Sequence, residues 1–142
     1  ENLHLIVADL SLALAEKKTQ KHPNATPIAL DIFNAEARKS AIEKASIVIS
    51  MLPAHLHIEI AKDCLHFKKH LVTASYISDA MQALDEEAKQ NNLIFMNEIG
   101  LDPGIDHMSA MKVIDEIRSK EMMLFKSFRN FDSREMRNFK EN

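Results

Sequence analysis

The sequence predicts an α/β fold with a doubly wound parallel sheet, and two observations support this. Short apolar segments alternate with segments of helical spacing along most of the 142 residues. The apolar segments are apolar throughout, which is typical of strands in a parallel sheet that helices cover on both faces. Because 46% of the residues are hydrophobic, the chain can bury the core of one domain.

Each expected strand is followed by an expected helix. The strands are expected over residues 3–8, 26–32, 46–52, 70–75 and 93–99, and the helices over residues 11–20, 34–44, 53–68, 78–90 and 105–120. Ser11 and Asn34 are residue types that cap helix N-termini, and Pro53 suits a first helical turn. A last strand over 123–128 precedes a charged tail over 129–142, whose composition favours a solvated helix or a frayed end.

The overall composition favours a small polar ligand as the partner. With 18 basic and 21 acidic residues, the net charge of -3 indicates no nucleic-acid or anionic-membrane partner. The single Cys64 excludes an intrachain disulfide and suits a reducing compartment, so a cytoplasmic location is expected. Because no apolar run of about 18 residues is present, the chain is expected to be soluble.

Ligands of doubly wound sheets bind outside the carboxyl ends of the strands. The candidate cofactor-binding residues at these ends are Asp9, Asp31, Ser50, Met51, Leu52, Pro53 and Ser75, with Tyr76 beside them. Asp9 ends the first strand, where dinucleotide-binding folds place the acid that hydrogen-bonds the adenine ribose. A carboxylate there repels a 2'-phosphate, which predicts NAD rather than NADP. Alternatively, Asp9 supports the start of the following helix.

The dinucleotide-binding fingerprint also requires a glycine-rich turn about 20 residues before that acid. The chain begins eight residues before Asp9. The sheet is therefore expected to lack its first strand and the glycine-rich turn that holds the cofactor phosphates.

Both glycines of the chain lie in the segment NEIGLDPGIDH, together with Glu98, Asp102, Asp106 and His107. Glycines beside clustered carboxylates in a loop suggest polar recognition or proton transfer. Asp102 has a second interpretation, as a cap of the helix that follows Pro103. For Asp106 and His107, in the first turn of that helix, a structural role is favoured.

A metal site is not predicted. The possible ligands are His55, His57, Cys64, His66 and His70. His55 and His57 diverge on a helix, because only residues three or four apart lie side by side. No familiar zinc spacing is present.

Two long motifs, VTASYISDAM and EIGLDPGIDHM, lie in the segment 68–117, which closely resembles the saccharopine dehydrogenase family, and the glutamate-forming enzymes in particular. A weaker similarity extends back through VISMLPAHLHIEIAKDCL and VADLSLALAEK, so the resemblance covers roughly residues 1–128.

The resemblance implies a Rossmann-like dinucleotide-binding domain interrupted by a substrate and dimerisation domain. Residues 1–104 would form a partial dinucleotide-binding domain, 105–128 a crossover helix and strand toward the substrate domain, and 129–142 a tail of uncertain placement. Such enzymes oxidise the secondary amine of saccharopine with a nicotinamide cofactor, giving glutamate and 2-aminoadipate semialdehyde in lysine metabolism. Without most of the second domain, this chain is expected to be an inactive fragment of a possible homodimer.

The resemblance also gives roles to individual residues. The segment Ser50 to Pro53 would pass beside the ribose and phosphates of the cofactor, and Ser75 and Tyr76 would lie near the nicotinamide and the substrate. Asp102 would face the substrate, where a carboxylate can hold an ammonium group or assist proton movement. Tyr76 and Asp102 are therefore the candidate catalytic residues. Two alternatives stay open: a carboxynorspermidine- or homospermidine-forming relative, and a non-catalytic Rossmann-like binding module.

Overall fold

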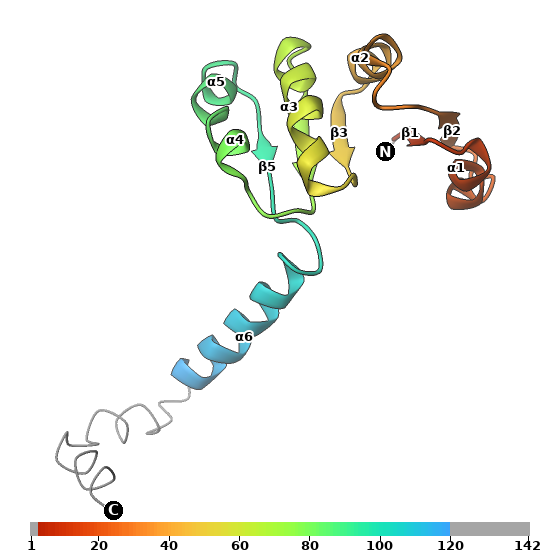
Figure 1. Cartoon of the computed structure of the whole chain (residues 1–142). Coiled ribbons are helices and arrows are strands. Elements are labelled where there is room, and N and C mark those ends of the chain that lie inside the picture. The colour runs from red at the N-terminus through yellow and green to blue at the C-terminus, as the bar shows by residue number, and fades with distance from the viewer. Residues whose placement is uncertain (1–2, 120–142) are drawn as a thin grey trace, which may run out of the picture.

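A computed structural model describes residues 3–119, and its helices and strands alternate as the sequence predicts (Figure 1). The strands are β1 (Leu5–Asp9), β2 (Ala25–Ala29), β3 (Ile47–Ser50), β4 (His70–Thr73) and β5 (Phe95–Met96). The helices are α1 (Leu12–Thr19), α2 (Ala35–Lys44), the 3-10 turn η1 (Ala54–Leu56), α3 (His57–His66), α4 (Asp79–Gln82), α5 (Asp85–Gln90) and α6 (Ile105–Ser119). The strand expected over 123–128 and the tail over 129–142 lie outside the described residues.

All strand pairs are parallel, as predicted, but they form two sheets rather than one. β1 pairs with β2, and the second sheet has the order β3-β4-β5. No ladder joins β1 to β3 within residues 3–119, and the apolar side chains of Ile47 and Ile49 on β3 are 56% and 61% exposed. In a doubly wound sheet the first strand lies between the two strands that correspond to β1 and β3. The division therefore falls at the position that the first strand occupies in such a sheet.

Helix starts follow the predicted capping chemistry in part. The side chain of Asn34 accepts a hydrogen bond from the Ala37 amide (3.1 Å), which confirms it as the cap of α2. Ser11 precedes α1 without a side-chain cap of its own. The helix expected over 78–90 is divided into α4 and α5, and α5 begins with consecutive acidic residues, Asp85 to Glu87. Acidic side chains stabilise a helix N-terminus, which favours the start of a new helix at Asp85.

The core lies around α3. Ile60, Ala61 and Cys64 of this helix pack with Leu71 of β4 and with side chains of α2 and α4. Burial, the main cause, raises the pKa of the Cys64 thiol to about 12, so this thiol stays protonated at neutral pH. Cys64 is therefore a core residue rather than a metal ligand or a nucleophile.

A buried ion pair joins the two helices beside this core. Arg38 of α2 donates to the carboxylate of Asp63 on α3 (2.6 Å) and also to the carbonyl oxygen of Ile32 in the β2–α2 loop. The two side chains are only 11% and 8% exposed. The pair thus fixes the position of α2, α3 and a loop at once.

Helix α6 extends away from the strands and the other helices (Figure 1). None of its residues is buried, and Met108, Met111 and Val113 are exposed. Within residues 3–119, no helix is long and apolar enough to cross a membrane.

Candidate functional site

The predicted site residues that follow β3, β4 and β5 gather at one edge of the second sheet. Ser50 ends β3, Ser75 and Tyr76 follow β4, and the segment from Asn97 to Gly104 follows β5. Because these strands are parallel and adjacent, their carboxyl ends meet at the same edge. The structure therefore brings together Ser50, Ser75, Tyr76 and Asp102.

The two candidate catalytic residues are in direct contact. The Tyr76 hydroxyl donates a hydrogen bond to Oδ1 of Asp102 (2.7 Å). Tyr76 is 60% exposed, so its ring is accessible from solvent. The hydrogen bond to Asp102 raises the pKa of Tyr76, and the negative charges of Asp106 and Glu98 act in the same direction. The phenol thus stays protonated at neutral pH and lies among three carboxylates, an arrangement that suits a cationic ligand group.

The two glycines shape the loop that carries Asp102. A Cβ atom on Gly104, whose φ is +144°, would lie 2.2 Å from the carbonyl oxygen of Gly100. A Cβ atom on Gly100 would lie 2.9 Å from the carbonyl oxygen of Ala74. The contacts that require glycine are therefore with the protein's own backbone, and the close approach of a ligand stays a prediction.

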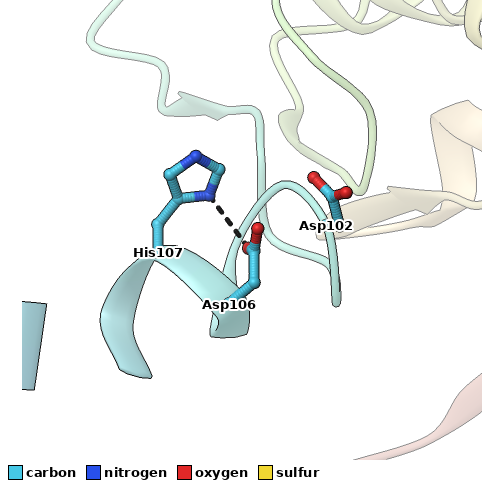
Figure 2. A group of neighbouring side chains, drawn as sticks. All are labelled: Asp102, Asp106 and His107. Carbon is cyan, nitrogen blue, oxygen red and sulfur yellow. Dashed lines mark hydrogen bonds and ion pairs between the residues drawn. The ribbon is translucent and has the colours of Figure 1, made fainter. Parts of the chain in front are cut away.

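Asp102, Asp106 and His107 form a second group, in which one possible ligand atom from each residue lies within 4.8 Å of the others (Figure 2). Asp106 accepts a hydrogen bond from the Gly104 amide (3.0 Å) and contacts Nδ1 of His107 (2.9 Å). The Gly104 contact agrees with the predicted role of Asp106 at the start of α6. All three side chains are exposed and already have hydrogen-bond partners, so their proximity does not by itself make a metal site.

A buried histidine links the ends of β3 and β4. Nδ1 of His57 lies 2.8 Å from the Ser50 hydroxyl, and Nε2 lies 2.9 Å from the Ser75 hydroxyl. His57 is 3% exposed, and burial lowers its pKa. The sequence interpretation treated His57 only as a possible metal ligand and missed this link. The available signal was a histidine at the start of a helix, with serines at two neighbouring strand ends.

Asn97 and Glu98, whose orientation the sequence left open, have separate partners. Asn97 accepts a hydrogen bond from the Thr73 hydroxyl (3.0 Å) inside the sheet edge. The Glu98 carboxylate accepts one from the Ile77 amide (3.3 Å), and the Glu98 amide donates to the carbonyl oxygen of Ser75 (3.1 Å). Glu98 therefore supports the turn that presents Tyr76.

Asp9 and Asp31 lie apart from this group, at the carboxyl ends of β1 and β2 in the other sheet. Asp9 Oδ1 accepts a hydrogen bond from the Ser11 amide (2.8 Å), and Asp31 Oδ1 accepts one from the Phe33 amide (2.9 Å). Both are local side-chain turns. For Asp9 this is the alternative role, support of the helix start, and its contact with a ribose stays a prediction.

The described residues fit one part of a dinucleotide site. Met51 is 75% exposed beside Leu52 and Pro53, so an apolar surface at the end of β3 is available to a flat ring or ribose. The anion-binding part of such a site is a glycine-rich turn at a helix N-terminus. Both glycines of the chain belong to the loop after β5, so the described residues supply no such turn. A surface hollow elsewhere, between Leu3 and the α1–β2 turn, lies at the amino ends of β1 and β2, opposite the predicted site.

Comparison with known proteins identifies relatives along most of the chain. The family model described as "Saccharopine dehydrogenase NADP binding domain" matches residues 1–96. The alpha-aminoadipic semialdehyde synthase of Arabidopsis thaliana is 39% identical over 130 residues, which are 92% of this chain and 12% of that protein. The saccharopine dehydrogenase [NADP(+), L-glutamate-forming] of Pyricularia oryzae is 41% identical over 117 residues, 82% of this chain and 26% of that protein.

A solved structure gives the same result. The apo histidine-tagged saccharopine dehydrogenase (L-Glu forming) from Saccharomyces cerevisiae matches with a TM-score of 0.70 and 37% identity. The match covers 82% of this chain and 26% of that chain.

The comparisons do not support the predicted preference for NAD, because the family description and the fungal relative both name NADP. The Asp9 carboxylate, on which that prediction depended, is engaged in supporting the start of α1. The family and the fold class agree with the sequence interpretation: this chain belongs to the saccharopine dehydrogenase family and has the α/β, Rossmann-like fold of its NADP-binding domain.

Proposed function

We propose that this chain is the cofactor-binding part of an oxidoreductase of lysine metabolism that oxidises the secondary amine of saccharopine to an imine, which water hydrolyses to glutamate and 2-aminoadipate semialdehyde. The observation that carries the proposal is the exposed pair of Tyr76 and Asp102 at the carboxyl edge of the second sheet. The names of the relatives support the reaction and the substrate. In this proposal the described residues up to 104 belong to the cofactor side, and α6 leads toward a substrate domain.

The electrostatics of the site suit this substrate. Saccharopine carries cationic amine groups. Carboxylate oxygens of Asp102 and Asp106 lie within 4.8 Å of each other, and Asp102 accepts from the Tyr76 hydroxyl, so the two carboxylates can attract such a group together. Tyr76 fixes Oδ1 of Asp102, and within residues 3–119 the other carboxylate oxygen accepts no hydrogen bond, so it can face the substrate. Asp102 then holds an ammonium group, or accepts the proton that the amine loses as its C–N bond is oxidised.

The cofactor would lie across the ends of the strands. A bound nicotinamide dinucleotide supplies the hydride acceptor. The segment Ser50 to Pro53 would border its ribose and phosphates, with Asp9 and Asp31 on the adenine side and Ser75 toward the nicotinamide. The chain's own part is to orient the reacting carbon and to hold the proton.

The test is the oxidation of saccharopine by the full-length protein that contains this sequence, with NADP+ and then NAD+. We expect reduced cofactor, glutamate and the semialdehyde in equal amounts. The 142-residue chain assayed in parallel should be inactive and bind NADPH poorly. Its described residues include no glycine-rich turn at a helix N-terminus that could bind the cofactor phosphates. Turnover of a carboxynorspermidine substrate in place of saccharopine, or none with either cofactor, would contradict the proposal.

Asp9 gives a separate prediction about cofactor choice. Asp9→Ser should raise the ratio of kcat/KM with NADP+ to kcat/KM with NAD+ by about tenfold, because a carboxylate near the ribose repels the 2'-phosphate. Serine can still accept the hydrogen bond from the Ser11 amide, so the helix start is preserved.

The matched control is Glu16→Gln, which removes a charge from an exposed position of α1. This control should leave the ratio unchanged. If Asp9→Ser leaves it unchanged as well, Asp9 supports only the helix start.

A further inference from the structure

The linked residues Ser50, His57 and Ser75 connect the two sides of the proposed site. Ser50 begins the segment assigned to the cofactor, and Ser75 directly precedes Tyr76 on the substrate side. Their hydroxyl groups lie within hydrogen-bonding distance of opposite nitrogens of the same ring, at 2.8 and 2.9 Å. A single buried side chain therefore spans the carboxyl ends of β3 and β4.

The ring is held in one state by its surroundings. His57 begins α3 and is 3% exposed, and desolvation lowers its pKa, so the imidazole is neutral at neutral pH. A neutral imidazole has one N–H donor and one acceptor nitrogen. One serine must then accept from the ring while the other donates to it, and both hydroxyl oxygens are held against the ring.

The turn held by His57 also carries Tyr76. The carbonyl oxygen of Ser75 accepts from the Glu98 amide (3.1 Å), so the backbone before Tyr76 is held from a second side. From this position the Tyr76 hydroxyl reaches Asp102 at 2.7 Å, across 26 residues of sequence. His57 contacts the side chain of Ser75, and Tyr76 is the next residue. A change in this contact would therefore shift the Tyr76 ring.

We propose that His57 is a positioning residue that fixes the Ser75–Tyr76 turn, and through it the contact between Tyr76 and Asp102. Its kinetic consequence rests on the proposed function, whereas its effect on Tyr76 does not. Without the link to Ser75, the turn should move, and the phenol should spend less time on the carboxylate.

Two substitutions separate the two ends of the ring. The amide of asparagine occupies the position of Nδ1, and the amide of glutamine occupies the position of Nε2. His57→Asn therefore keeps the contact with Ser50 and loses the one with Ser75, and His57→Gln does the reverse. His55→Asn is the matched control, because His55 is an exposed histidine on the preceding turn.

The first measurement is the phenol titration of the 142-residue chain, followed by ultraviolet absorbance. Tyr76 is the only tyrosine in the chain, which contains no tryptophan, so the signal belongs to this residue alone. We expect both His57→Asn and Asp102→Asn to lower the pKa of Tyr76 toward its ordinary value, and His57→Gln to retain the raised value. A raised value that survives in His57→Asn would overturn the proposal, and so would an ordinary value in the unsubstituted chain.

The second measurement is steady-state kinetics of the full-length protein with saccharopine. His57→Asn should lower kcat by about tenfold with little change in the KM for the cofactor, because misplaced site groups slow the chemical step. His57→Gln should recover most of that loss. Equal losses in both variants together with a lowered melting temperature would show a packing role and overturn the proposal. If the unsubstituted protein does not turn over saccharopine, the proposed function fails, and the titration still decides the role of His57.

Discussion

Asp102→Asn in the full-length protein is expected to lower kcat/KM for saccharopine by about ten- to 150-fold, the loss that corresponds to one charged hydrogen bond. The substitution keeps the shape of the side chain and an oxygen that can accept from the Tyr76 hydroxyl. What it removes is the negative charge that would hold an ammonium group or accept a proton. Since Asp102 is exposed, the melting temperature and the affinity for the cofactor should stay nearly unchanged.

The control for this experiment is Asp115→Asn on α6. Asp115 is also exposed, and its contact with a basic partner, Arg118 at 3.7 Å, is a surface ion pair of little energetic weight. This control should change neither the kinetics nor the melting temperature. Unaltered kinetics of Asp102→Asn together with a lowered melting temperature would mean that Asp102 only supports the loop.

Arg38→Ala is expected to lower the free energy of unfolding by about 3–5 kcal/mol. It leaves the carboxylate of Asp63 buried without its cationic partner, and it removes the donor to the carbonyl oxygen of Ile32. Such a loss is a large part of the stability of a typical small domain. The measurement is urea-induced unfolding of the 142-residue chain followed by circular dichroism.

Two comparisons separate the buried pair from an ordinary surface pair. Lys62→Ala breaks an exposed contact with Glu59 (3.0 Å) on the same helix as Asp63, and it should cost no more than about 1 kcal/mol. The double variant Arg38→Met, Asp63→Leu removes both charges and should recover most of the stability lost in Arg38→Ala. Equal losses of unfolding free energy in Arg38→Ala and Lys62→Ala would show that the buried pair stabilises the fold no more than a surface pair does.

The local chemistry of the sequence was sufficient to predict the fold class and many of the element starts. Apolar runs separated by helical spacing predict a parallel α/β fold because burial on both faces of a sheet constrains every residue of a strand. Asn34 predicts the start of α2 because a capping side chain acts on an amide only three residues away. The division of the strands into two sheets, by contrast, became visible only in the structure.

The expected strand lengths were wrong at several ends, most clearly for β5, which spans only Phe95–Met96 of an apolar run expected to form a strand over 93–99. The length of a strand depends on its pairing partner, and β5 pairs only with Leu71 and Val72 of β4. An apolar run by itself contains no information about where a neighbouring strand ends.

The candidate site was predicted as a set of residues, whereas its contacts were decided by the tertiary structure. Tyr76 and Asp102 were identified through their motifs, but their hydrogen bond depends on how the loop after β5 crosses the end of β4. The link from His57 to Ser50 and Ser75 was missed for the same reason. Hydrogen bonds between distant residues require a particular alignment of neighbouring strands and helices, and that alignment is set by the packing of the whole core rather than by any local pattern.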